Sequence, residues 1–213
     1  ENCAYYIPIN HKDFFNKSKL QKQISEQKIL TTIKSVCFNK SILKVGQNIK
    51  YDMRVLKKYG ITFNAIADTM LMSYALDNGI TRHGMDDLAF LHFNHSTLKF
   101  KDIVGSGKKQ ISFEYVNLEE ATKYAAEDAL ITLKLFNFLK KRVVKEKSSY
   151  VYEKIDKPLI HVLCLMEDLG IKIDQKYLKQ LSLEFQNQSE KLEKKIFNIT
   201  KKNFNIGSPK QLG

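Results

Sequence analysis

The chain has 213 residues, of which 43% are hydrophobic and 27% charged, so it can bury a core and does not have the composition of a disordered tail. Three scattered cysteines exclude a disulfide framework, and no apolar run approaches the roughly 18 residues of a membrane span, so we expect no membrane partner and a cytoplasmic location. The net charge of +12 makes nucleic acid the leading class of partner, although a solvated lysine-rich surface explains the same excess.

The first third of the chain alternates predicted strands and helices. Residues 3–9 are apolar and aromatic, which predicts a strand. Apolar positions at helical spacing predict a helix over 19–39. A brief strand at 42–45 precedes a helix over 48–59, and a further short strand is predicted over 61–67.

Helices dominate the middle of the chain. Asp68 is the predicted N-cap of a helix, and another helix is expected over 84–93. Residues 94–116 are less regular, and the spacing over 118–144 is strongly helical. Strands interleaved with helices predict an α/β domain over 1–145, although three strands are few for such a sheet.

The last part of the chain has a different pattern. A helix is expected over 150–169, a short strand at 171–173 and a long helix over 175–200. Residues 146–213 are therefore predicted to form a separate and mainly helical piece.

The stretch GQNIKYD at 46–52 lies at a predicted strand-to-helix turn, where side chains can reach a ligand. Asn48 and Asp52 are four residues apart and share one face of the helix. The alternative interpretation is structural, with Asn48 as the N-cap and Asp52 as a first-turn charge that complements the helix dipole.

Tyr124 and Asp128 are also four residues apart, on the predicted helix over 118–144. Apolar neighbours make Asp128 costly to bury unless a metal ion or a hydrogen-bond partner compensates. The alternative is a half-exposed acid beside a tyrosine at the edge of the core.

Together and in order, these stretches resemble two of the three motifs of the DEDD 3′–5′ exonucleases, and the tyrosine four residues before the last Asp is typical of the DEDDy branch. Nearly the whole chain resembles the proofreading exonuclease domain of bacterial family A polymerases, the DNA polymerase I family. The matching blocks are KVGQNIKYD (44–52), DTMLMSY (68–74), RHGMDDLA (82–89), EEATKYAAEDALITL (119–133) and KPLIHVLCLMEDLGIKID (157–174).

The resemblance implies a ribonuclease H-like exonuclease domain over 1–145, followed by the helical start of a family A polymerase domain over 146–213. It implies a bacterial, nucleoid-associated protein that binds a single-stranded DNA 3′ end or a primer–template. A polymerase active site is not expected, because the chain ends before the corresponding regions.

The resemblance also implies two divalent ions, Mg²⁺ or Mn²⁺, with Asp52 and Asp128 among their ligands. Tyr124 would orient the attacking water. A surface ion pair with Asp86 is the alternative role for Arg82, and a place in the core is the alternative role for the aromatic side chain at position 100. The residues implied to contact DNA are Gln47, Asn48, Tyr51, Arg82 and Phe100.

The family's first motif, an Asp-x-Glu pair at the end of a strand, has no counterpart before Asn48. Two of the four metal-binding carboxylates are therefore absent, and we expect the first strands of the domain to be absent with them. The hypothesis is a chain that is inactive or weak alone, unless other chains supply the missing N-terminal and polymerase parts. The alternatives are a non-catalytic DNA-binding module and a ribonuclease D-like RNA exonuclease.

Overall fold

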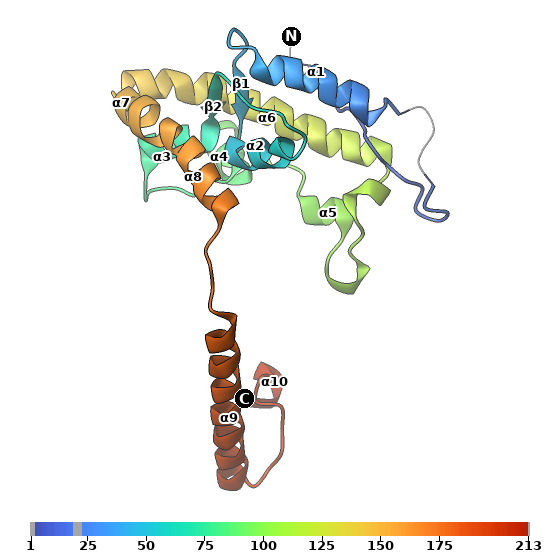
Figure 1. The fold of residues 1–213 in the computed structure, drawn as a ribbon, viewed down its shortest axis with the longest axis vertical. Coiled ribbons are helices and arrows are strands. Elements are labelled where there is room, and N and C mark those ends of the chain that lie inside the picture. Colours follow the sequence, from blue (N-terminus) through green and yellow to red (C-terminus); the bar gives the residue numbers. More distant parts are fainter. Residues whose placement is uncertain (1–2, 19–22, 213) are drawn as a thin grey trace. The chain divides into compact units, whose positions relative to one another are not determined.

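The computed structural model describes residues 3–18 and 23–212 (Figure 1). One compact unit ends at Asp168 and a second begins at Leu169. In chain order, the elements of the first unit are α1 (Glu26–Phe38), β1 (Lys44–Gly46), α2 (Ile49–Lys57), β2 (Ile66–Asp68), α3 (Thr69–Asp77), α4 (Met85–Phe93), α5 (Phe100–Val104), the short 3₁₀ turns η1 (Gly107–Lys109) and η2 (Phe113–Tyr115), α6 (Leu118–Lys145), α7 (Ser149–Val151), the π-helical segment η3 (Tyr152–Asp156) and α8 (Lys157–Leu169).

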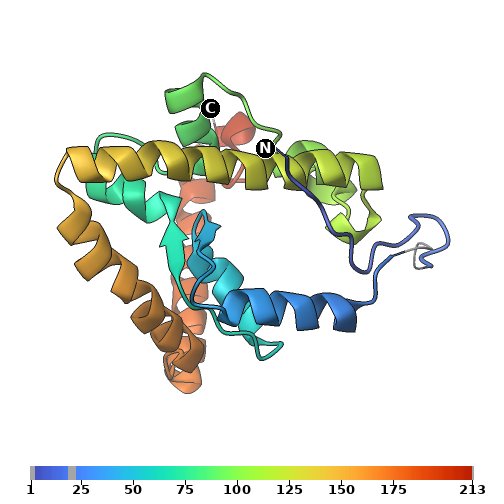
Figure 2. The same cartoon turned by 90° about the horizontal axis from the view of Figure 1, so that it is seen from above.

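The sheet of the first unit is small and parallel. β1 pairs with β2, with Lys44 opposite Ile66 and Gly46 opposite Asp68. β2 leads directly into α3, and only Gln47 and Asn48 separate β1 from α2, so the starts of α2 and α3 lie at the same edge of the sheet. Figures 1 and 2 both show the long helix α6 beside the strands, and α6 contacts β1 along its middle.

Three groups of buried side chains hold this unit together. The largest joins α6 to α3, α4 and η3, and Leu88, Leu135 and Leu139 are fully buried within it. A second group packs Ile49 of α2 against β2 and α8. A third lies under α5 and the start of α6. Because α8 contributes to the second group, it belongs to the first unit, and this compact unit extends beyond the predicted boundary at 145/146.

Several predicted elements are confirmed within a few residues, namely the helices over 48–59, 84–93, 118–144 and 175–200 and the strand at 42–45. The helix predicted over 150–169 is also present, but its second turn widens into the π-helical η3. Asp68 is confirmed as the N-cap of α3. The strand predicted over 61–67 is reduced to β2, because only its end pairs with β1.

The predictions near the N-terminus are partly wrong. Residues 3–9 form no strand; instead the Tyr6 hydroxyl contacts the His11 ring and its side chain packs on the third buried group. The helix predicted over 19–39 begins at Glu26. Gln23 is non-helical, because its side-chain amide binds the backbone of His11. Residues 19–22 lie outside the described residues.

The second unit contains α9 (Gln175–Thr200) and α10 (Pro209–Leu212). Asp174 caps α9 by accepting hydrogen bonds from the amides of Lys176 and Tyr177. The strand predicted at 171–173 is wrong, since this segment has no ladder partner and is exposed. Among the residues that the structure describes, none of the helices has the length and apolar character needed to cross a bilayer.

Candidate functional site

Asp52 and Asp128 line the same cavity, whose volume is about 580 Å³. Asp52 comes from the first turn of α2, and Asp128 comes from the middle of α6. The cavity lies at the end of β1, so folding brings together two acids that are far apart in the sequence. The remaining lining residues are Leu43, Val45, Gly46, Gln47, Met85, Ala129, Thr132 and Leu133.

The turn between β1 and α2 fixes where Asp52 lies. At Gly46 a β-carbon would be too close to Ile49, which is 2% exposed and packs beneath the turn. Asn48 takes the left-handed conformation (φ 59°, ψ 49°), which asparagine tolerates better than most side chains. The helix then starts at Ile49 and presents Asp52 in its first turn, where a negative charge is favourable.

The carboxyl group of Asp52 is harder to ionise than that of an ordinary aspartate. Burial, together with the negative charge of Asp68, raises the pKa of Asp52 to about 6. The side chain as a whole is nevertheless exposed, so water screens part of this effect.

Asp128 is more enclosed. Burial raises its pKa to about 6; a polar contact with Tyr124 acts in the opposite direction, and the charges of Asp86 and Glu127 add to the rise. Burial and the Asp128 charge raise the pKa of Tyr124 to about 12, so its hydroxyl stays protonated and can donate. The buried Oδ1 of Asp128 has no hydrogen-bond partner in the described part of the chain.

An unpartnered buried carboxylate oxygen is costly, and a cation would offset that cost. Within residues 3–18 and 23–212, no group of three or more His, Cys, Asp or Glu side chains is arranged to share a metal ion. Mg²⁺ is commonly held by one or two carboxylates and keeps several of its waters. Asp52 and Asp128 therefore fit a hard divalent ion that remains largely hydrated.

The three residues near the start of α2 that are predicted to contact DNA line different cavities. Gln47 lines the cavity, where its side-chain amide accepts from the Thr69 hydroxyl and donates to the His83 carbonyl oxygen. Asn48 borders a second cavity of about 390 Å³. Tyr51 borders a depression on the outer face of α2.

Arg82 is exposed, and no ion pair links it to Asp86 among the described residues. Asp86 instead accepts a hydrogen bond of 2.6 Å from the Thr97 hydroxyl. The guanidinium of Arg82 is therefore not neutralised by the partner that the sequence suggested.

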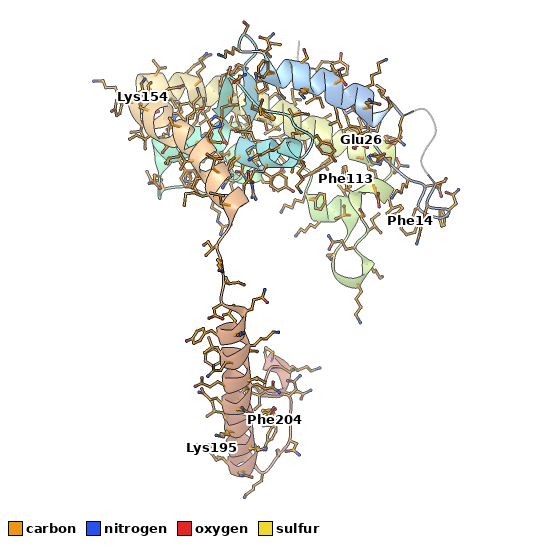
Figure 3. All side chains as sticks on the ribbon, in the orientation of Figure 1. Phe14, Glu26, Phe113, Lys154, Lys195 and Phe204 are labelled. Carbon is orange, nitrogen blue, oxygen red and sulfur yellow. The ribbon has the colours of Figure 1, made fainter. Side chains whose placement is uncertain are left out.

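Phe100, at the start of α5, is 46% exposed, so it is not an ordinary core residue. Its ring stacks on that of Phe113 with centroids 5.9 Å apart, and both rings contact Tyr124 (Phe113 is labelled in Figure 3). Phe113 was not among the predicted site residues. Phe113 lies in the irregular segment over 94–116, outside any predicted helix or strand, so no periodic pattern marked it as a site residue.

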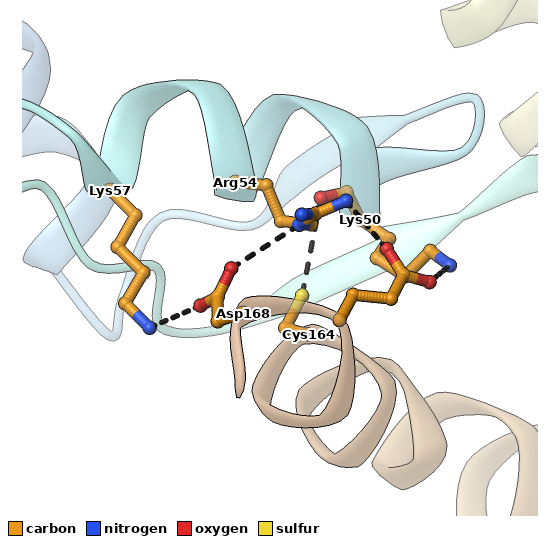
Figure 4. A network of polar contacts seen from close by, with 6 residues as sticks. Lys50, Arg54, Lys57, Cys164 and Asp168 are labelled. Carbon is orange, nitrogen blue, oxygen red and sulfur yellow. Dashed lines mark hydrogen bonds and ion pairs between the residues drawn. The ribbon is translucent and has the colours of Figure 1, made fainter. Parts of the chain in front are cut away.

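A polar network joins α2 to α8 and was also missed (Figure 4). Arg54 pairs with Glu167 at 2.6 Å and with Asp168 at 3.3 Å. Lys50 pairs with Glu167, and Lys57 pairs with Asp168. The three basic side chains are spaced i, i+4 and i+7, a helical stripe that the sequence does contain.

Comparisons with known proteins agree with one another. Residues 3–144 match a family model described as 3′–5′ exonuclease. DNA polymerase I of Rhizobium leguminosarum is 42% identical over 99% of this chain and 21% of its own length. DNA polymerase I of Pseudomonas aeruginosa is 38% identical over 100% of this chain and 23% of its own length. The chain thus spans about a fifth of the length of these curated relatives.

Solved structures share the fold. The POL domain of Pol1 from M. smegmatis, in complex with DNA primer-template and dNTP, has a TM-score of 0.62 and 22% identity over 92% of this chain and 31% of that chain. Brucella melitensis NrnC bound to pGG has a TM-score of 0.52 and 19% identity over 72% of this chain and 70% of that chain.

Proposed function

Because the chain belongs to the 3′–5′ exonuclease family of DNA polymerase I, we propose that its cavity takes the 3′ end of a single DNA strand for phosphodiester hydrolysis. The observation that carries this proposal is the meeting of Asp52 and Asp128 in one cavity, with one buried carboxylate oxygen unpartnered. A bound Mg²⁺ or Mn²⁺ would activate water and neutralise the developing charge on the phosphate.

The residues of the chain take separate roles in this proposal. Asp52 and Asp128 hold the divalent ion. Tyr124, whose hydroxyl stays protonated, donates a hydrogen bond that orients water beside Asp128. The half-exposed ring of Phe100 stacks on the terminal base without distinguishing one base from another. The exposed guanidinium of Arg82 binds a phosphate.

The proposed DNA contacts near α2 need more than one nucleotide. Gln47 lines the cavity with Asp52, whereas Asn48 and Tyr51 border other depressions. We therefore propose that Gln47 meets the terminal nucleotide and that Asn48 and Tyr51 meet nucleotides further from the end.

We also propose how the chain divides into domains. Residues 1–145 would form a ribonuclease H-like exonuclease domain, and 146–213 would form the helical start of a polymerase domain. The match to the exonuclease family model ends at residue 144, which supports this division, and the bacterial origin of the curated relatives supports the bacterial cytoplasm as the location. Primer–template DNA is the proposed partner.

We propose further that the chain alone hydrolyses DNA slowly, because its sequence contains no Asp-x-Glu pair before Asn48. The test uses purified chain, Mn²⁺, and 3′-labelled single strands of DNA and of RNA. We expect Mn²⁺ to strengthen binding of the DNA strand, with little hydrolysis. Asp128→Asn should abolish the effect of Mn²⁺ without unfolding the chain.

The other outcomes separate the alternatives. Rapid hydrolysis that Asp128→Asn abolishes would support the site but contradict the slow rate. Rapid hydrolysis that survives this substitution would overturn the site. DNA binding that responds neither to Mn²⁺ nor to Asp128→Asn would favour the non-catalytic module. A strong preference for the RNA strand would favour the RNA exonuclease.

A further inference from the structure

Asp68, the last residue of β2, is a carboxylate that is 2% exposed. Its side chain accepts hydrogen bonds from four backbone amides. Two belong to the start of α3, at 2.9 Å from Met70 and 3.3 Å from Leu71. The other two belong to the start of α2, at 3.1 Å from Asn48 and 2.8 Å from Ile49.

An ordinary N-cap serves only the helix that follows it, and the bonds to Met70 and Leu71 fulfil that role for α3. The bonds to α2 are additional. They arise because Gly46 and Asp68 stand opposite each other in the parallel sheet, so both strand ends turn into helices at the same point. Two helix N-termini therefore direct amide groups at one carboxylate, and these hydrogen bonds offset part of the cost of burying its charge.

The backbone of Asp68 is also hydrogen-bonded. Its own amide donates a 3.0 Å hydrogen bond to the hydroxyl of Tyr152, which is 1% exposed in the largest buried group. The start of α2 is thus connected through Asp68 to η3. Asp52 lies one turn after Ile49, so a shift in the start of α2 moves Asp52 relative to Asp128.

We infer that Asp68 is a positioning residue for Asp52. Through the amides of Asn48 and Ile49 it fixes the start of α2, so that Asp52 shares the cavity with Asp128. The consequence for metal binding rests on the proposed function, whereas the control of α2 by Asp68 stands on the hydrogen bonds alone.

The test uses Asp68→Asn, which keeps one carbonyl oxygen but presents an NH₂ group to the Ile49 amide. The matched control is Asp174→Asn, because Asp174 caps α9 with the same chemistry in the second unit. Amide hydrogen exchange is measured by NMR at Asn48, Ile49, Met70 and Leu71. Mn²⁺ affinity is measured by calorimetry on the same proteins.

In Asp68→Asn we expect the Ile49 amide to exchange at least about 10-fold faster, while the Met70 amide stays close to the parent rate. Mn²⁺ affinity should fall about 10-fold, as when residues that orient metal ligands are removed. Asp174→Asn should change neither quantity. A folded Asp68→Asn protein with parent-like exchange at Ile49 would overturn the inference. Faster exchange with unchanged Mn²⁺ affinity would overturn the link to Asp52.

A second variant and the hydrogen-exchange readout cover two further cases. If Asp68→Asn does not fold, Asp68→Ser takes its place, because a serine hydroxyl can cap α3 but is too short to reach Ile49. In that variant, parent-like exchange at Ile49 would contradict the inference and faster exchange would support it. If the parent chain binds no Mn²⁺, the proposed function fails, and the contrast between Ile49 and Met70 still decides whether Asp68 fixes α2.

Discussion

Gly46 lies directly against Ile49, and a β-carbon built on Gly46 would stand 2.8 Å from the Ile49 β-carbon. Gly46→Ala should therefore force Ile49 and the start of α2 to shift. We expect a loss of about 1–3 kcal/mol in the free energy of unfolding, measured by urea denaturation. Gly84→Ala is the control, because its nearest neighbour is the end of the Asp87 side chain, which can move. Equal effects of the two substitutions would contradict the prediction.

Asn48 offers a way to separate backbone conformation from DNA contact. Its left-handed conformation costs Ala about 1 kcal/mol or more but costs Gly little, so Asn48→Ala should destabilise the chain more than Asn48→Gly. If the side chain contacts DNA, both variants should weaken binding of a labelled single strand, measured by fluorescence anisotropy. Parent-like binding by Asn48→Gly would remove Asn48 from the proposed contacts.

The raised pKa of Asp128 makes stability depend on pH. Because its pKa is about 6 in the folded chain and about 4 when unfolded, the folded state favours the protonated acid. The resulting stabilisation is complete below about pH 4 and is lost as the pH rises through about 6. In metal-free buffer at pH 7, we expect Asp128→Asn to stabilise the chain by about 1–2 kcal/mol, after allowance for partial exposure.

Urea denaturation at pH 4 and pH 7 in the presence of a chelator measures this effect. Added Mn²⁺ should stabilise the parent chain and leave Asp128→Asn unchanged, because only a state that binds the ion gains from it. If Asp128→Asn destabilises the chain equally at pH 4 and pH 7, burial of the ionised Asp128 carboxylate does not cost folding free energy, and the prediction is wrong.

Phe100 should contribute to strand binding by stacking. We expect Phe100→Ala to weaken binding of single-stranded DNA by about 1–3 kcal/mol, by a similar amount for dT and dA oligonucleotides. Phe15→Ala is the control, since Phe15 is 91% exposed and contacts neither Phe113 nor Tyr124. Anisotropy titrations measure both variants, and equal losses would rule out a specific role for Phe100.

The sequence predicts the meeting of Asp52 and Asp128 only through the order and spacing of its motifs. Helical spacing alone places each acid on a face of its own helix, and it says nothing about which helices meet. The resemblance to a known family supplied that missing information, and the shared cavity agrees with it.

Other features depend on tertiary register and escape local patterns. Asp68 is predictable as the cap of α3, but its bonds to α2 require Gly46 to stand opposite it across the sheet. Residues 3–9 have the composition of a strand, yet an apolar pattern indicates burial and does not identify a pairing partner. The segment therefore packs through Tyr6 without joining the sheet.

The ion pairs between α2 and α8 connect Asp52 with the chain that continues past Asp168. Because these ion pairs are partly exposed, added salt should weaken them, whereas the buried contact of Ile49 with Ile160 and Cys164 should persist.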